Sequence, residues 1–495
     1  MRVNRSNQPS QSQMDSQSIQ SIDQVRSYVT DIFGNTDDLA VVAVRIGETS
    51  GLLCYLETMT SVPFIMDHII RPLSHMKESE ALSSTEAMLG GLMEKYFGGL
   101  SCELIDDLKD LAHKLVAGYA GLAIDGASSI LVLDVKKMDN RTVAEPTSQG
   151  VVRGPKDGFT ESADTNMSLI RRRLINERLR FEKYAVGAKS RTAVYIAYLE
   201  GGVDSKVLDK IRKRLQMSQM TSVMDSGNLE ELLRPRSFSL FPTIYSTERP
   251  DAVCSSIMEA KAAIIVNGSP FVLVVPAVMN DFFKSPEDHY QWFAFGTFTR
   301  LLRYLAFFFS LFVPSIYIAI TTFHAELIPT VLLTSIVAQR EGIPFPAVIE
   351  ILLMEITFEI LREAGTRMPR VVGQTISIVG ALVLGEAAVQ AGIVSSINVI
   401  VVSLTAISGF AAPIYTFGTN VRLLRFGFIF LAGLLGLYGI IVGAVYLLVH
   451  LVRLQSFSVA YLSPLVPFRV SNQKDAVLIF QTPLPDEGIG GESRE

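Results

Sequence analysis

The chain has 495 residues and a net charge of only −5, so it has room for two or three domains and no charge excess that would indicate nucleic-acid binding. Hydrophobic residues make up 49% of it and the mean hydropathy is +0.33, which is high for a soluble protein. Three widely separated cysteines (Cys54, Cys102 and Cys254), without a CxxC motif or a nearby histidine cluster, argue against a disulfide framework and a structural zinc site.

The first segment, residues 1–24, is rich in Ser, Gln and Asn and contains no apolar run. This composition predicts a disordered tail and does not fit a signal peptide. We therefore expect the soluble part of the chain to lie on the cytoplasmic side of a membrane.

A first soluble block is predicted at 25–148. Its short β-branched runs at 40–44 and 129–133 are typical of strands, and the stretches at 83–96 and 101–116 have helical patterns. This alternation of strands and helices predicts an α/β subdomain.

A second α/β subdomain is predicted at 149–290. The hydroxyl of Thr160 or Ser162 can cap a helix that runs to about Leu179. Further elements are expected as strands at 181–188 and 191–199, a helix at 203–216, and a hairpin that turns at 267–270.

The part from 291 to 455 is predicted to be an all-α membrane domain, because a spanning helix needs about 20 apolar residues. Four segments qualify: 304–322, 371–393, 397–415 and 426–451. A fifth helix at 345–364 is long enough but carries four glutamates, which gives about five helices in all. Gly439 and Gly443 form a small-xxx-small pair that indicates close helix packing.

Positive charges bear on orientation, because cytoplasmic ends of spanning segments are rich in Lys and Arg. Three arginine pairs precede predicted spans: Arg300 with Arg303, Arg367 with Arg370, and Arg422 with Arg425. If all three pairs lie in the cytoplasm, the chain has to return there between Arg303 and Arg367. This favours the glutamate-bearing helix as a second membrane crossing. The side of the C-terminal tail, 456–495, stays open.

The glutamates of that helix are costly in a bilayer, at roughly 2.5 kcal/mol or more each near its centre. Glu355, Glu359 and Glu363 fall on one side of the helix with Arg362 beside them, whereas Glu350 lies opposite. This stripe predicts either the mouth of a cation pathway or interhelical pairing.

The following segment carries a stripe of small, weakly polar residues on one face, with larger apolar residues on the others. The stripe consists of Gln374, Ser377, Ala381, Gly385 and Ala388. Such a face allows another helix to approach closely, or lines a narrow pore when several copies surround an axis. The residues alone leave both interpretations open.

The remaining motifs do not indicate a phosphate-binding, catalytic or metal site. The segment 153–161 has two glycines and a proline but no GK[ST], so it predicts a fixed turn rather than a phosphate loop. The run at 171–173 spreads around a helix and predicts a solvated surface or a contact with anionic lipid. No HExxH or GxSxG occurs, so we predict no catalytic residue, no metal site, no cofactor and no enzyme activity.

Several strings are similar to the signature of the A subunits of bacterial spore germinant receptors. They are Arg153-Gly-Pro-Lys-Asp-Gly-Phe-Thr-Glu-Ser162, Arg340-Glu-Gly-Ile-Pro-Phe-Pro346, Leu353-Met-Glu-Ile-Thr-Phe-Glu-Ile-Leu-Arg-Glu-Ala-Gly365 and Gly373-Gln-Thr-Ile-Ser-Ile-Val-Gly380. The first supplies the signature turn, whose candidate residues are Arg153, Gly154, Pro155, Gly158, Phe159 and Glu161.

This resemblance implies a nutrient-sensing subunit in the inner membrane of dormant spores, working with a transporter-like B subunit and a lipoprotein C subunit. It also implies a homo-oligomer, with five copies as the suggested form, that releases monovalent cations when a germinant binds the partner subunit. With five copies around an axis, the small-residue stripe becomes the expected pore lining and the glutamate stripe a cation-attracting mouth. The signature turn would fix the relative orientation of the two soluble subdomains or contact a neighbouring subunit.

Three alternatives remain beside the channel hypothesis. One is a scaffold subunit that relays a signal and conducts nothing, and another is a related spore channel component that amplifies germination. A secondary transporter ranks last, because no internal repeat is visible in the sequence.

Overall fold

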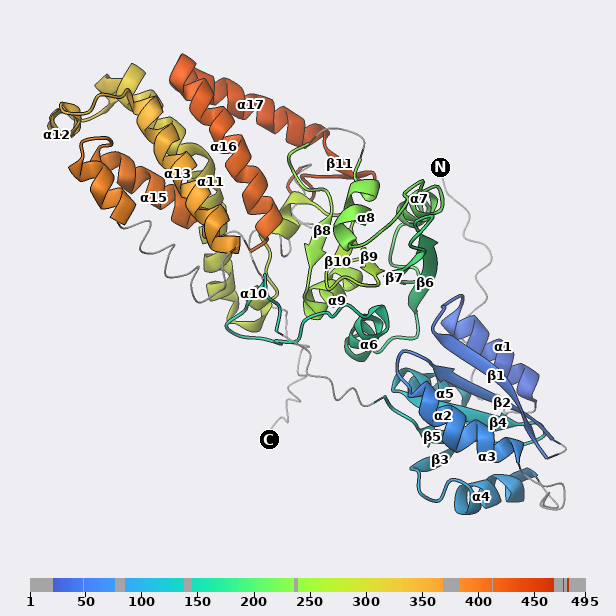
Figure 1. The fold of residues 1–495 in the computed structure, drawn as a ribbon. Helices are drawn as coiled ribbons and strands as arrows, with labels where there is room; N and C mark the ends of the chain where they lie inside the picture. The colour runs from blue at the N-terminus through green and yellow to red at the C-terminus, as the bar shows by residue number, and fades with distance from the viewer. Residues whose placement is uncertain are drawn as a thin grey trace, which may run out of the picture. The chain divides into compact units, whose positions relative to one another are not determined.

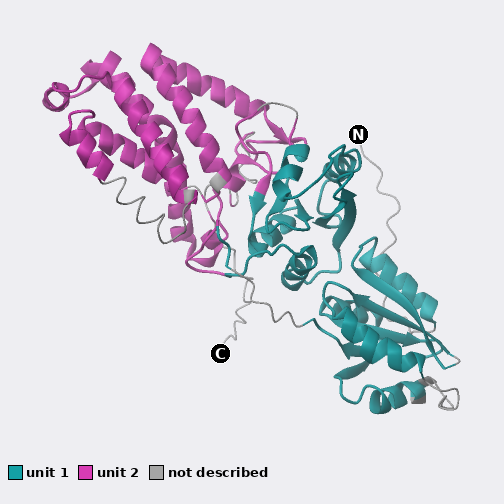
Figure 2. Ribbon diagram, viewed as in Figure 1, with its two compact units in different colours: residues 1–147, 155–233, 246–275 teal, residues 148–154, 234–245, 276–495 magenta. Residues whose placement is uncertain are grey.

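The computed structural model describes residues 21–47, 49–75, 85–137, 145–235, 239–367, 383–411, 413–466, 475 and 479. It divides the chain into two compact units (Figure 2). Unit 1 comprises Met1–Thr147, Pro155–Leu233 and Ser246–Val275, and unit 2 comprises Ser148–Gly154, Arg234–Tyr245 and Pro276–Glu495.

Unit 1 contains two five-stranded sheets (Figure 1). The first has the order β1-β2-β4-β5-β3, with β1 (Leu39–Ile46), β2 (Thr49–Leu56), β3 (Cys102–Ile105), β4 (Tyr119–Ile124) and β5 (Ile130–Asp134). Its helices are α1 (Ile22–Phe33), α2 (Val62–Ile65), the π-helix η1 (Met66–Ile70), α3 (Arg71–Ser74), α4 (Thr85–Lys95) and α5 (Leu108–Val116). Strands and helices alternate as predicted, and each strand pair in this sheet is antiparallel.

The first sheet is covered on both faces, because side chains of successive strand residues point to opposite sides. Along β2, Leu52, Cys54 and Leu56 pack with α1 and α5 in one core. Leu53 and Tyr55 pack with η1, α3 and α4 in the other.

One predicted helix was wrong at its start. The stretch 101–116 was expected to be helical throughout, but it begins with β3 and only then forms α5. Asp107 separates the two, because its carboxylate accepts a hydrogen bond from Lys109 N (2.9 Å) and caps the helix there.

The second sheet has the order β6-β7-β9-β10-β8. Its strands are β6 (Leu179–Val186), β7 (Thr192–Leu199), β8 (Tyr245–Thr247), β9 (Ala262–Val266) and β10 (Val272–Val275), and its helices are α6 (Ala163–Arg173), α7 (Ser205–Gln216), α8 (Ser226–Leu233) and α9 (Pro250–Met258). The predicted hairpin is confirmed, since β9 and β10 pair antiparallel with Ile264 opposite Leu273.

Helix α6 begins where its cap was predicted but ends earlier. Ser162 Oγ accepts a hydrogen bond from Thr165 N (3.4 Å). The helix stops at Arg173 rather than near Leu179, because the Asn176 side chain accepts from Arg178 N (2.8 Å) and turns the chain into β6.

A buried ion pair joins the parts of unit 1 that carry the two sheets. Arg171 of α6 donates from Nε and Nη2 to the Asp38 carboxylate at 3.0 and 2.9 Å, and both side chains are buried. Thr36 and Thr58 donate to the same carboxylate. The prediction of a solvated surface at 171–173 was therefore wrong for Arg171, whose partner lies far away in the sequence.

Burial by itself would raise the pKa of Asp38, but the charge of Arg171 and the hydrogen bonds from Arg171, Thr36 and Thr58 outweigh it, so the pKa lies below its ordinary value of 3.8. A lowered pKa means that the carboxylate stabilises the fold above the ordinary value. That contribution is lost as the pH falls through the lower, folded-state value.

Unit 2 is mainly helical. Its principal helices are α11 (Phe293–Phe323), α12 (Thr330–Arg340), α13 (Ala347–Arg367), α15 (Ser396–Phe410), α16 (Tyr415–Leu435) and α17 (Leu437–Arg453), and residues 383–390 are also helical. Helix α11 packs against α15 and α16, and α13 contacts α11, α15 and α16. Short elements flank them: the 3-10 helices η3 (Met279–Phe282) and η4 (Ala325–Leu327), α10 (Glu287–Tyr290), β11 (Gln455–Ser456) and β12 (Val459–Ala460).

Among the described residues, two helices are long and apolar enough to cross a membrane, Phe293–Phe323 and Thr416–Leu435. Two shorter apolar helices, α15 and α17, accompany them. The predicted count of about five crossing helices stays a prediction, and most of the predicted span 371–393 lies outside the described residues.

The predicted single span at 426–451 was wrong. Gly436, at φ 62°, ends α16, and α17 starts at the next residue. A side chain there would come within 2.9 Å of Phe323 Cβ, so glycine is needed at this break. Gly439 and Gly443 of α17 then lie against Leu431 of α16.

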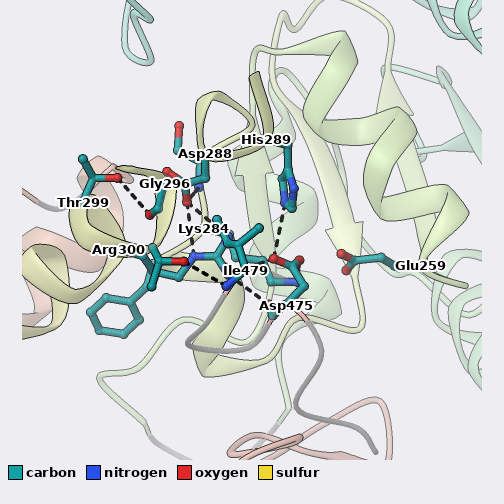
Figure 3. A network of polar contacts seen from close by, with 12 residues as sticks. Glu259, Lys284, Asp288, His289, Gly296, Thr299, Arg300, Asp475 and Ile479 are labelled. Carbon is teal, nitrogen blue, oxygen red and sulfur yellow. Dashed lines mark hydrogen bonds and ion pairs between the residues drawn. The ribbon is translucent and has the colours of Figure 1, made fainter. Parts of the chain in front are cut away.

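The C-terminal tail returns to the start of α11 (Figure 3). Arg300, fully buried, lies between Asp288 (3.2 Å) and Asp475 (2.8 Å), and Lys284 and His289 also contact Asp475. Tyr461, which follows α17, also contacts the segment before α11, because Met279 N donates to Tyr461 O (2.8 Å). Both ends of the helical part of unit 2 therefore meet.

The variant Asp38→Asn is expected to lose about 3 kcal/mol of stability at neutral pH, because it leaves the Arg171 charge buried without a counter-ion. Asp67→Asn is the control, because Asp67 pairs with Arg71 on the exposed surface of η1 and should change stability by less than about 0.5 kcal/mol. Denaturant unfolding of the full chain in mild detergent measures both. The difference between wild type and Asp38→Asn should shrink below pH 3.8, and a difference that stays constant with pH would contradict this account.

Candidate functional site

The most unusual group of side chains in unit 2 is a charged cluster between α13 and α16. Glu355 is fully buried and accepts a hydrogen bond from Arg425 Nη1 at 3.0 Å. Glu359 lies 3.4 Å from Arg422 Nη1 and 3.8 Å from Arg425 Nη2. Two carboxylates of one helix thus face two guanidinium groups of its neighbour.

The remaining members of the predicted glutamate stripe lie differently. Arg362 contacts Glu359 at 3.5 Å and lies over the Phe358 and Phe410 rings. Glu363 is exposed and pairs with Arg367 at 2.6 Å, one turn further along α13. The structure therefore brings Glu355, Glu359 and Arg362 into one cluster and leaves Glu363 at its surface.

The prediction that Arg422 and Arg425 precede a span was wrong. Both lie inside α16, which is itself a candidate span, and both are buried. Their spacing of three residues on an otherwise apolar helix, matched to glutamates four apart, was the signal that could have indicated pairing.

The small-residue stripe is described only in part. Gln374, Ser377 and Ala381 lie outside the described residues. Gly385 is buried, with Val399 of α15 3.7 Å from the position of an added Cβ, and Ala388 is half-buried. The stripe as a pore lining stays a prediction.

The signature turn is fixed mainly through its backbone. Pro155 O accepts from Arg249 Nη2 at 3.1 Å, and Phe159, whose side chain is buried, donates its N–H to Glu248 O at 2.7 Å. Glu161 O accepts from Gly268 N at 2.7 Å, at the turn of the β9–β10 hairpin. Gly158 is buried beside Phe159, and these contacts hold the turn against unit 1.

The first two signature residues, Arg153 and Gly154, belong to unit 2 and make their contacts within it. Arg153 N donates to Glu287 Oε1 at 3.3 Å. Gly154 has φ +131°, and an added Cβ would lie 2.5 Å from Tyr290 Cδ2. The side chain of Tyr290 thus occupies the space that only a glycine leaves open.

The described residues give no sign of metal or thiol chemistry. Among them, no group of three or more His, Cys, Asp and Glu side chains could hold a metal ion. Burial raises the pKa of Cys54 and Cys254 to about 12, so both thiols stay protonated and unreactive at neutral pH.

Comparison with known proteins gives a consistent result. The family described as Bacillus/Clostridium GerA spore germination protein matches residues 27–487. Spore germination protein KA of Bacillus subtilis strain 168 is 44% identical over 91% of this chain and 82% of its own length. Spore germination protein A1 of the same organism is 38% identical over 89% of this chain and 93% of its own.

One solved structure is also similar. It is the N-terminal domain of the A subunit of the Bacillus megaterium spore germinant receptor GerK3, with 27% identity and a TM-score of 0.43. The similarity covers 53% of this chain and 98% of that domain.

The variant Gly154→Ala is expected to destabilise the protein by about 1–2 kcal/mol, because alanine disfavours the positive φ and its methyl group meets Tyr290. Gly150→Ala is the matched control, since nothing lies within 4 Å of its added Cβ. The thermal unfolding midpoint of the full chain measures both. Equal midpoints for the two variants would rule out the tight contact at Tyr290.

Neutralising one partner of the Glu355–Arg425 pair leaves the other charge buried. Glu355→Gln and Arg425→Gln should each lower the thermal midpoint in detergent by about 6 °C or more. The double variant should lose clearly less than the sum of the two, because no lone charge remains. The control Glu363→Gln, at an exposed pair, should have little effect on the midpoint. Additive losses in the double variant would show that Glu355 and Arg425 do not interact.

Proposed function

This chain belongs to the GerA family of spore germination proteins, and we propose that it is the membrane-embedded A subunit of a germinant receptor. In this proposal it assembles with further copies of itself, five being the expected number, and with a transporter-like B subunit and a lipoprotein C subunit. The assembly lies in the spore inner membrane, with the two α/β subdomains in the cytoplasm. When a germinant binds the B subunit, the assembly releases monovalent cations.

One observation carries the membrane part of this proposal: charged groups are enclosed by helices whose outer faces are apolar. Glu355 and Arg425 are buried between α13 and α16. The exposed faces of unit 2 carry large hydrophobic residues, including Phe298, Leu305 and Phe308 of α11, Phe430 and Leu434 of α16, and Ile441 and Leu448 of α17. A polar interior with an apolar exterior suits a lipid environment, and ionisable residues placed there are functional-site candidates.

The ion pairs of the glutamate stripe favour interhelical pairing over a cation-attracting mouth for Glu355 and Glu359. Because Glu355 and Glu359 face arginines, we assign them to holding α13 against α16. Glu363 is exposed and pairs with Arg367 at the end of α13, so it takes no part in the contact with α16. The conduit itself we assign to the stripe at Gln374, Ser377, Ala381, Gly385 and Ala388, around the axis of the oligomer.

The test is potassium release from spores that carry variants of the stripe. Ala381→Leu should slow germinant-triggered release at least several-fold, because three carbons added per copy narrow the conduit, and Ser377→Ala should change its kinetics. The matched control is Val383→Leu, an exposed position off the stripe. Immunoblots confirm that each variant is present at the wild-type level.

Unchanged potassium kinetics across the stripe variants would overturn the conduit. Crosslinking of the purified chain in mild detergent then identifies the alternative: a chain that stays monomeric favours a scaffold that relays the signal without conducting.

A further inference from the structure

A second buried polar cluster lies where α11, α12, α13 and α15 meet, apart from the pair at Glu355. It consists of Tyr317 of α11, Arg340 at the end of α12, Glu350 in the first turn of α13, and Ser395 and Asn398 at the start of α15. Glu350 and Asn398 are fully buried and Ser395 nearly so. Tyr317 lies on α11, which contacts both α13 and α15.

One oxygen of Glu350 is held firmly. Its Oε2 accepts hydrogen bonds from Ser395 N at 3.1 Å and from Asn398 Nδ2 at 2.5 Å. Both donors come from the first turn of α15, where the helix dipole also favours a carboxylate. The Glu350 side chain is therefore fixed in place by backbone and amide groups rather than by its counter-ion.

The other oxygens of the cluster are left without hydrogen bonds. Glu350 Oε1, Asn398 Oδ1 and the Tyr317 hydroxyl are buried and have no hydrogen-bond partner. Buried polar atoms are normally paired, and each unpaired one costs about 1–3 kcal/mol. Carboxylate and amide oxygens are donor types that hard cations take in proteins.

The counter-ion of Glu350 is loosely held. Arg340 Nη2 lies 3.3 Å from Glu350 Oε1, and Arg340 Nε has no hydrogen-bond partner. The Arg340 side chain is 24% exposed, whereas that of Arg425, which hydrogen-bonds Glu355, is 1% exposed. The carboxylate is thus rigid and its positive partner stands at the edge of the cluster.

We propose that Glu350 and Asn398 form a binding site for a monovalent cation, and that the Arg340 guanidinium occupies the place of that cation in the present conformation. A single carboxylate suits one positive charge rather than two. Arg340 and a bound cation exclude each other, because both compensate the same charge in a dry interior. This site lies within one chain and goes beyond the proposed conduit, since binding here needs neither oligomer nor conduction.

The test replaces the charged Arg340 side chain with a neutral one and supplies dissolved cations in its place. Purified full-length Arg340→Gln, in mild detergent, is heated in lithium, sodium, potassium or choline chloride at equal ionic strength. Its midpoint should fall in choline chloride and recover by roughly 5 °C, in a saturable way, with at least one of the three metal ions. The wild type should show no such preference, because Arg340 already fills the site.

Two further variants separate this binding from a general salt effect. Arg340→Gln combined with Glu350→Gln should abolish the cation-specific recovery, because the carboxylate that attracts the ion is gone. Arg367→Gln, at the exposed pair with Glu363, should behave alike in all four salts.

The proposal is overturned if Arg340→Gln unfolds at the same midpoint in choline and in all three metal chlorides, or if the double variant keeps the recovery. It is also overturned if Arg340→Gln and Arg340→Met both fail to fold in every salt, since a cation then cannot replace the guanidinium. Unchanged potassium release in the stripe variants, which would overturn the conduit, leaves these binding outcomes unaffected, so the two proposals fail separately.

Discussion

A carboxylate inside an apolar helical bundle requires a positive partner from another helix, and this constraint organises unit 2. Inserting an ionised group costs at least ~2.5 kcal/mol on insertion scales, whereas two opposite charges 4 Å apart attract by about 4 kcal/mol at an effective dielectric constant of 20. Glu355 and Arg425 meet at 3.0 Å, so their attraction offsets much of the cost of inserting both charges, which neither charge alone would recover. The pair in turn fixes which faces of α13 and α16 oppose each other.

Unit 1 depends on the same type of contact in a different environment. Asp38 and Arg171 are separated by 133 residues, and their bidentate pair fixes α6 and β6 against the start of the first sheet. Arg180 adds a hydrogen bond to Ile32 O at 2.7 Å, and Phe181 N donates to Thr36 Oγ1 at 3.1 Å. The two sheets are thus joined through specific polar contacts, which set their relative orientation more sharply than apolar packing does.

Local pattern was sufficient for elements whose partners are close in sequence. The β9–β10 hairpin and the Ser162 cap depend on a few neighbouring residues, and both were predicted. The burial of Arg171 and Arg425 was not predicted, because their partners lie 133 and 70 residues away. Arginines that are adjacent or closely spaced in a sequence are usually taken as solvent-exposed. The break at Gly436 was missed for another reason: hydropathy is continuous across it, and the glycine is required by its positive φ and by its contacts with Phe323 and His324.

The cluster at Arg300 limits the topology of the membrane part. Arg300 stands at the start of α11 and contacts Asp475 of the tail as well as Asp288, which precedes α11. A chain whose entry and exit meet at one membrane face crosses that membrane an even number of times. In the proposed membrane arrangement, five crossings would place Asp475 and Asp288 on opposite sides of the bilayer, so their contact through Arg300 favours an even number of crossings. Helix α12, with 11 residues, is too short to cross a bilayer alone, and Arg340 at its end pairs with Glu350 inside unit 2.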